Sequence, residues 1–133
     1  MQVIDKICLI DDDQFYLFSM RRMIEINHLC STIAECKNGQ EAINYISKIL
    51  ADKDALPDVI FLDINMPIMN GWEFLDAYEK LGARLKRKSR LYVVSSSIDS
   101  NDKARAKSYK MVTDYIIKPV SIDQLKELIV GKS

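Results

Sequence analysis

The sequence has few glycines, and those it has are far apart. Its 133 residues include only four, at positions 39, 71, 82 and 131. Neither the GxGxxG pattern of dinucleotide-binding folds nor the GxxxxGK pattern of phosphate-binding loops can be written with them. Both motifs need glycine where backbone amides approach a phosphate group. A nucleotide cradle of either kind is therefore excluded.

Net charge, paired cysteines and long apolar runs are lacking as well. Nineteen Lys and Arg residues balance nineteen Asp and Glu residues, so no overall positive field attracts nucleic acid or an anionic membrane. The three cysteines, Cys8, Cys30 and Cys36, form no CxxC pair and are predicted to be reduced thiols. No run approaches the ~20 apolar residues of a membrane span, and no signal-like leader is seen. We expect a cytoplasmic protein that binds neither nucleic acid nor membrane.

Length and hydrophobic pattern predict one α/β domain. Short β-rich apolar runs alternate with longer segments at helical spacing, which is typical of βα units on a parallel sheet. The five expected strands are residues 6–10, 31–36, 58–62, 90–95 and 113–117. The five expected helices are residues 14–26, 39–50, 72–81, 99–110 and 123–130. Several strands are apolar throughout, as strands covered on both faces should be.

Two of the expected helices show an apolar face. Residues at helical spacing are predicted to pack on the sheet. They are Phe15, Phe18, Met23 and Ile26 in the first helix, and Ala42, Ile43, Ile46 and Ile49 in the second.

Polar side chains follow four of the strands. The carboxyl ends of parallel strands meet at one edge of such a sheet, where ligands bind. The first strand precedes Asp11, Asp12 and Asp13, the third precedes Asp63, the fourth ends at Ser95 and the fifth precedes Lys118. Gathered carboxylates raise one another's pKa unless a cation joins them. Oxygen ligands suit Mg²⁺, with Mn²⁺ as a substitute, better than zinc.

Asp63 is the candidate nucleophile, because it sits at the rigid end of an apolar strand. A carboxylate oxygen can attack a phosphoryl group in line and form an acyl phosphate. Lys118 and Ser95 are predicted to contact the phosphate, although the serines at 95–97 are also compatible with a polar turn that caps the next helix. Asp13 is predicted to cap the first helix, a role that any single strand-end aspartate could also have.

Four ordered motifs carry a resemblance to a known family. They are Leu9-Ile10-Asp11-Asp12, the segment from Leu62 to Gly71, Val93-Val94-Ser95, and Tyr115-Ile116-Ile117-Lys118-Pro119. Over essentially its full length the chain resembles a response-regulator receiver domain of bacterial two-component signalling, of the stand-alone, chemotaxis-regulator-like kind. One departure is Asn70, where the family usually has aspartate, and it concerns the capping of this loop rather than the chemistry.

The resemblance implies a fold and a chemistry. The fold would be a flavodoxin-like three-layer sandwich with strand order 2-1-3-4-5, a single receiver domain over residues 1–133 with no output domain on this chain. Asp63 would accept a phosphoryl group from a phosphohistidine on a sensor histidine kinase or a histidine phosphotransfer protein. Asp11, Asp12, Asp63 and the backbone carbonyl of Asn65 would bind Mg²⁺. The bond between Lys118 and Pro119 would be cis.

The resemblance also implies how the signal leaves the domain. The Tyr115 ring would turn from solvent toward the core when the phosphate draws Ser95 inward. That movement would change the face of the fourth helix, fifth strand and fifth helix, where a protein target binds. An ordinary half-buried strand tyrosine is the alternative. The chain would be a phosphoacceptor rather than an enzyme, assisting its own phosphorylation and dephosphorylation, and a monomer or weak dimer.

Two other functions stay open. Asp11 and Asp13 form a DxD pair like that of haloacid-dehalogenase phosphatases, which are Mg²⁺-dependent, but Phe15 stands where a hydroxyl residue is expected. A phosphorylation-independent interaction module is the other alternative. The basic residues of segments 84–90 and 103–110 are expected mostly to be solvated. His28, the single histidine, is assigned no role in phosphotransfer.

Overall fold

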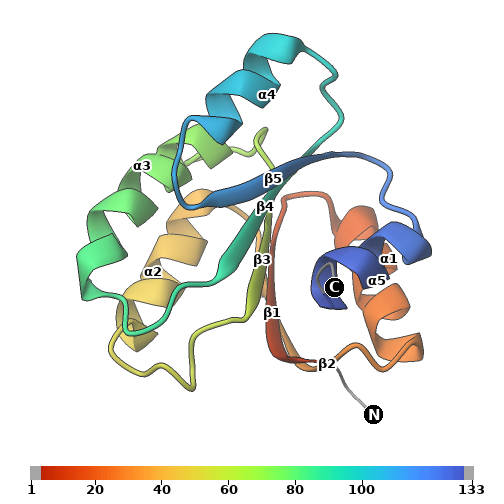
Figure 1. Cartoon of the computed structure of the whole chain (residues 1–133), viewed down its shortest axis with the longest axis horizontal. Coiled ribbons are helices and arrows are strands. Elements are labelled where there is room, and N and C mark those ends of the chain that lie inside the picture. Colours follow the sequence, from red (N-terminus) through yellow and green to blue (C-terminus); the bar gives the residue numbers. More distant parts are fainter. Residues whose placement is uncertain (1–3, 131–133) are drawn as a thin grey trace.

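A computed structural model describes residues 4–130 and confirms the α/β prediction (Figure 1). Five parallel strands form one sheet in the order β2-β1-β3-β4-β5. The strands are β1 (Ile4–Ile10), β2 (Cys30–Cys36), β3 (Val59–Leu62), β4 (Arg90–Ser95) and β5 (Val112–Ile117). The helices are α1 (Gln14–Ile26), α2 (Gly39–Ile49), α3 (Gly71–Leu81), α4 (Ser100–Lys107) and α5 (Ile122–Val130), with a short 3-10 turn, η1 (Gly82–Arg84), after α3.

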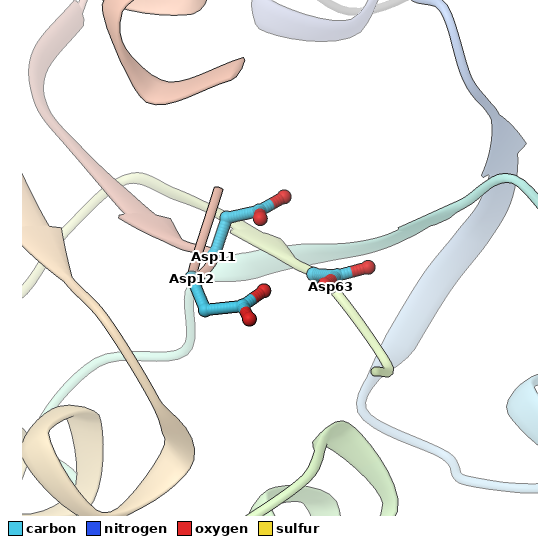
Figure 2. A group of neighbouring side chains, drawn as sticks. All are labelled: Asp11, Asp12 and Asp63. Carbon is cyan, nitrogen blue, oxygen red and sulfur yellow. The ribbon is translucent and has the colours of Figure 1, made fainter. Parts of the chain in front are cut away.

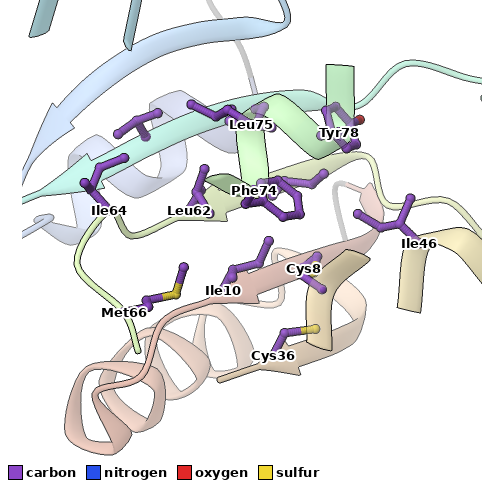
Figure 3. Packing of buried hydrophobic residues seen from close by; sticks show 14 of the residues in the cluster. Cys8, Ile10, Cys36, Ile46, Leu62, Ile64, Met66, Phe74, Leu75 and Tyr78 are labelled. Carbon is purple, nitrogen blue, oxygen red and sulfur yellow. The ribbon is translucent and has the colours of Figure 1, made fainter. Parts of the chain in front are cut away.

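Helices cover both faces of the sheet. Figure 1 shows α1 and α5 on one face and α2, α3 and α4 on the other. Successive side chains of a strand point to opposite faces, so Ile7 and Leu9 of β1 join the core beneath α1 and α5. Cys8 and Ile10 join the core on the other face, where Phe74 of α3 packs (Figure 3). Burial on both faces explains why β1 and β3 are apolar along most of their length.

The prediction for the inward face of α1 was wrong. Phe15 and Phe18 are 86% and 63% exposed, and Ile26 is exposed as well, while Met23 is only partly buried. The buried residues are instead Leu17, Met20 and Ile24. Apolar residues occur on several sides of this helix. Their spacing alone therefore fits two inward faces, and the chain's path from β1 selects one of them.

The prediction for the end of α4 was also wrong, by three residues. The helix ends at Lys107, where the Ser108 N–H donates to carbonyls of the last turn. The next residue, Tyr109, stacks its ring on Trp72 with 6.5 Å between ring centroids. That contact turns the chain toward β5. Ala106 is the only buried residue of α4, so this helix is held to the core by little apolar surface.

Two basic residues expected in a solvated loop have structural partners. The Arg87 guanidinium lies 2.8 Å from Asp58 Oδ1 and also donates to the Leu56 carbonyl. Arg90 donates to the carbonyls of Leu128 and Ile129, near the carboxyl end of α5. Arg87 therefore links the segment before β4 to the segment before β3, and Arg90 links the start of β4 to the end of α5.

All three cysteines, Cys8, Cys30 and Cys36, are free in the structure. Within residues 4–130, none of the helices has the length and apolar content that crossing a bilayer requires.

Candidate functional site

Three carboxylates meet at the carboxyl edge of the sheet. Asp11 and Asp12 follow β1 and Asp63 follows β3, which is the neighbouring strand (Figure 2). The Asp63 N–H donates to the Ile10 carbonyl at 2.9 Å, which fixes the two strand ends side by side. One carboxylate oxygen of each aspartate lies within 4.8 Å of the others. The structure thus brings the three predicted acids together.

These acids are held under electrostatic strain. Asp11 is 2% and Asp63 is 7% exposed, whereas Asp12 is exposed. Burial and, after it, the charge of Asp11 raise the pKa of Asp63, Lys118 opposes both, and the pKa that results is about 6. Repelling carboxylates of this kind are relieved by a cation, and an all-oxygen donor set suits a hard divalent ion. The residues present therefore fit a metal of the Mg²⁺ type.

Lys118 supplies the positive charge nearest to the buried acids. Its Nζ lies 2.8 Å from Asp11 Oδ2 and 3.5 Å from Asp63 Oδ1. Burial lowers the pKa of Lys118, but hydrogen bonding and charge from the two aspartates outweigh it, so the pKa lies above its ordinary value. The backbone N–H of Lys118 donates to the Ser95 carbonyl, and the bond to Pro119 is cis, as expected.

Ser95 ends β4 and is buried. Its Oγ accepts from the Ser97 N–H at 3.1 Å, which makes a polar turn after β4, but this turn does not itself cap α4. Ser97 Oγ donates to Asp102 Oδ2 and accepts from the Asp99 N–H, and it is Asp99 that caps α4. These bonds link the end of β4 to the first turn of α4.

The Tyr115 ring lies inside the protein, 6% exposed. Its hydroxyl donates to the Ser97 carbonyl at 2.8 Å, so it contacts the segment that follows Ser95. The structure shows the inward orientation, and the outward one stays a prediction.

The segment from Asp63 to Gly71 is packed closely against the site. A Cβ atom at position 71 would lie 2.5 Å from the Asp63 carbonyl oxygen and 2.7 Å from the Ile64 Cα. Only glycine allows that approach. Asn70 then caps α3, and its side chain and that of Glu73 form a reciprocal capping box. Asparagine thus performs the capping at this position, the one noted as a departure from the family's usual aspartate.

One residue at the site was missed by the sequence reasoning. The Tyr16 ring lies beside Lys118, whose Nζ is 4.2 Å from the ring centroid. A sequence signal for this residue was present in Asp13, the predicted cap of the first helix. Asp13 accepts from the N–H groups of Phe15 and Tyr16, and this cap sets which side chains of the first turn face the site. The incorrect prediction that Phe15 faces inward placed Tyr16 on another side of the helix, so its contact with Lys118 was not predicted.

Comparison with known proteins agrees with this geometry. The family model described as "Response regulator receiver domain" matches residues 7–130. A two-component response regulator from Cytophaga hutchinsonii has a solved structure with 35% identity and a TM-score of 0.84, over 94% of this chain and 93% of that one. The chain is 29% identical to an uncharacterized response regulatory protein of Yersinia pestis, over 90% of its own length but only 44% of that relative.

A more distant structure shares the fold. It is the CheX-CheY complex with BeF3 and Mg from Borrelia burgdorferi, with 17% identity and a TM-score of 0.74, over 93% of this chain and 85% of that one. The strand order, the acids at the carboxyl edge and the family match over 7–130 agree. The chain belongs to the response regulator receiver domain family.

Proposed function

We propose that this chain is a phosphorylation-dependent signalling switch whose phosphoacceptor is Asp63. The observation that carries the proposal is the arrangement of Asp63 beside a second buried carboxylate, Asp11, with the Lys118 ammonium in contact with both. A nucleophile, a cation site and a positive group for phosphoryl oxygens thus lie within one pocket. Phosphoryl transfer needs these elements and little further covalent chemistry from the protein.

The proposed metal is Mg²⁺, which Mn²⁺ could replace. Asp11, Asp12, Asp63 and the backbone carbonyl of Asn65 would hold it. When bound, the ion offsets the negative charge of the acids and of the incoming phosphoryl group. The all-oxygen donor set and the repulsion between Asp11 and Asp63 support this assignment.

In the proposed step, an Asp63 carboxylate oxygen forms a bond to phosphorus while the bond from phosphorus to the donor's imidazole nitrogen breaks. The electron pair of the broken bond stays on that nitrogen, and the product on Asp63 is an acyl phosphate. Lys118 is placed to bind a phosphoryl oxygen, because its ammonium already lies 3.5 Å from Asp63 Oδ1. Ser95, at the end of the adjacent strand, is proposed as a second hydrogen-bond donor.

The proposed phosphodonor is a protein, either a sensor histidine kinase or a histidine phosphotransfer protein. The single histidine of this chain, His28, follows α1, whose amino end is the end near the site. A helix of 13 residues is about 20 Å long, so His28 lies too far away to donate. Phe15, Ile68 and Ile98 lie on three different segments after β1, β3 and β4 and are all exposed, which offers a protein partner an apolar contact surface.

The proposed output surface is formed by α4, β5 and α5. Ser97 contacts both Asp102 of α4 and Tyr115 of β5, so a shift at the end of β4 reaches this surface directly. A charge-assisted hydrogen bond is worth about 1.5–3 kcal/mol, whereas moving a two-state equilibrium from 1:99 to 99:1 needs about 5.5 kcal/mol. Ser95, Lys118 and the metal must therefore act together. The proposed location is the cytoplasm, where cysteines are usually free, as all three are here. The proposed oligomeric state is a monomer or weak dimer.

Incubation with phosphoramidate, with Mg²⁺ or with EDTA, tests the proposal by phosphate-affinity gel mobility. We expect a slower band that needs Mg²⁺ and is absent in Asp63→Asn but present in Asp54→Asn, a control at an exposed turn residue. Multiple-turnover hydrolysis of p-nitrophenyl phosphate would favour the phosphatase alternative. An intact chain that never takes up phosphate would favour the phosphorylation-independent module.

A further inference from the structure

Tyr16 lies in the first turn of α1, at the wall of the phosphorylation pocket. Asp13 caps this helix and accepts from the Tyr16 N–H at 3.2 Å, which holds the tyrosine backbone close to the strand end. The side chain is partly buried and packs with the α1 and α5 core. Its ring is the aromatic surface against Lys118.

We propose that Tyr16 is a positioning residue that holds the ammonium group of Lys118 over the acidic pocket through the face of its ring. This inference rests on the proposed function and adds a residue to that same site. Lys118 Nζ is 4.2 Å from the ring centroid, 2.8 Å from Asp11 Oδ2 and 3.5 Å from Asp63 Oδ1. The ammonium thus has one aromatic and two anionic neighbours.

The surroundings strengthen the contact between the ring and the ammonium. The Lys118 side chain is 19% exposed, so its charge is largely shielded from water. Attraction between a cation and an aromatic face is greater when the cation is desolvated. A lysine side chain is long and flexible, and each fixed contact reduces the number of positions that its ammonium can occupy.

The ring matters most when a metal is present. A divalent cation held by Asp11 and Asp63 would compete with Lys118 for the negative charge of these aspartates, which would weaken the two ion pairs. The contact with the Tyr16 ring does not depend on the carboxylates and would be kept. It therefore holds the ammonium beside Asp63 at the stage when the phosphoryl oxygens arrive.

The hydroxyl of Tyr16 is not what places this residue. It is buried and has no hydrogen-bond partner among residues 4–130. A phenylalanine ring at this position should therefore hold the Lys118 ammonium equally well. This separates Tyr16→Phe, which keeps the ring face, from Tyr16→Leu, which keeps apolar bulk but removes the face.

The chain offers a matched control. Tyr45 on α2 also has a buried hydroxyl without a partner in the described part of the chain, and Lys6 lies over its ring at 6.0 Å. It is not at the acidic pocket. Tyr45→Leu thus repeats the chemical change of Tyr16→Leu away from the site.

The test measures the maximal rate of phosphorylation by phosphoramidate at saturating Mg²⁺, with thermal unfolding as a check on folding. We expect Tyr16→Leu to be slower by about 5- to 30-fold, or about 1–2 kcal/mol at 1.36 kcal/mol per factor of ten. Tyr16→Phe and Tyr45→Leu should stay within about twofold of the parent. In a Lys118→Ala background, Tyr16→Leu should add less than about twofold, because a residue acting through Lys118 has no effect without it.

Several results would overturn the inference while leaving the proposed function intact. They are an unchanged rate in Tyr16→Leu, an equal loss in Tyr16→Phe, or an additive loss in the Lys118→Ala background, provided that the parent is phosphorylated on Asp63. A parent that forms no adduct would instead overturn the proposed function.

A second measurement tests the contact without phosphorylation. The ring current of Tyr16 should shift the side-chain proton resonances of Lys118 upfield in the parent and in Tyr16→Phe, and the shift should vanish in Tyr16→Leu. Lys118 resonances that are the same in all three proteins would refute the inference.

Discussion

Replacing Asp63 with asparagine should stabilise the metal-free protein. In the folded state burial, and next to it the charge of Asp11, raises the pKa of Asp63 from 3.8 to about 6. A shift of about 2 units at 1.36 kcal/mol per unit sets an upper limit of about 3 kcal/mol on the cost of the charged carboxylate. Because the pocket opens partly to solvent, we expect a gain of about 1–2 kcal/mol at pH 7.5.

The pH dependence of this gain follows from the direction of the shift. Between about pH 4 and pH 6 the folded state binds more protons at Asp63 than the unfolded state, so stability falls as the pH rises through this window. Asparagine does not titrate. The advantage of Asp63→Asn should therefore be complete above about pH 7 and should fall below half at pH 4.5.

Urea unfolding followed by circular dichroism in EDTA measures both effects. Asp54→Asn is the control, because Asp54 is exposed. With saturating Mg²⁺ the parent should gain stability and Asp63→Asn should gain less. The reasoning would be refuted if Asp63→Asn were less stable than the parent at pH 7.5 in EDTA, or if its advantage were the same at pH 4.5.

Five other substitutions test the local structure by urea unfolding. Gly71→Ala should lose about 2 kcal/mol of stability, because a Cβ would overlap backbone atoms of Asp63 and Ile64. Gly82→Ala, where a Cβ would meet open space, should change little, and equal effects would contradict the close approach at Gly71. Asn70→Ala should lose about 1 kcal/mol with the α3 cap, and full stability in this variant would argue against the capping box. Met20→Ala should lose about 2–5 kcal/mol of unfolding free energy and Phe18→Ala less than about 0.5 kcal/mol, because only Met20 is buried. A larger loss in Phe18→Ala than in Met20→Ala would support the inward face of α1 that was predicted from spacing.

Much of the fold could be predicted from sequence because the strands are buried on both faces. β1 and β3 are apolar along most of their length, and each leads directly into an acid. Parallel strands place those acids at one edge whatever the details of the helices are. The positions of Asp11, Asp63 and Lys118 therefore followed from strand ends and connection rules alone.

The parts that could not be predicted depend on contacts between distant segments. The inward face of α1 is selected by how the helix leaves β1, and its sequence has apolar residues on several sides. The end of α4 is set by the stacking of Tyr109 on Trp72, 37 positions away in sequence. Tyr16 meets Lys118 across more than a hundred residues. The spacing of apolar residues along the sequence indicates helices and strands, but it does not indicate which distant side chains contact each other.

The central claim is that Asp63 carries the phosphoryl group, and chemical mapping tests it most directly. The chain is treated with phosphoramidate and Mg²⁺, the acyl phosphate is reduced with borohydride, and the modified residue is located by peptide mass spectrometry. The account predicts homoserine at position 63 in a metal-dependent yield. Modification at another residue, or the same yield at position 63 without Mg²⁺, would contradict it.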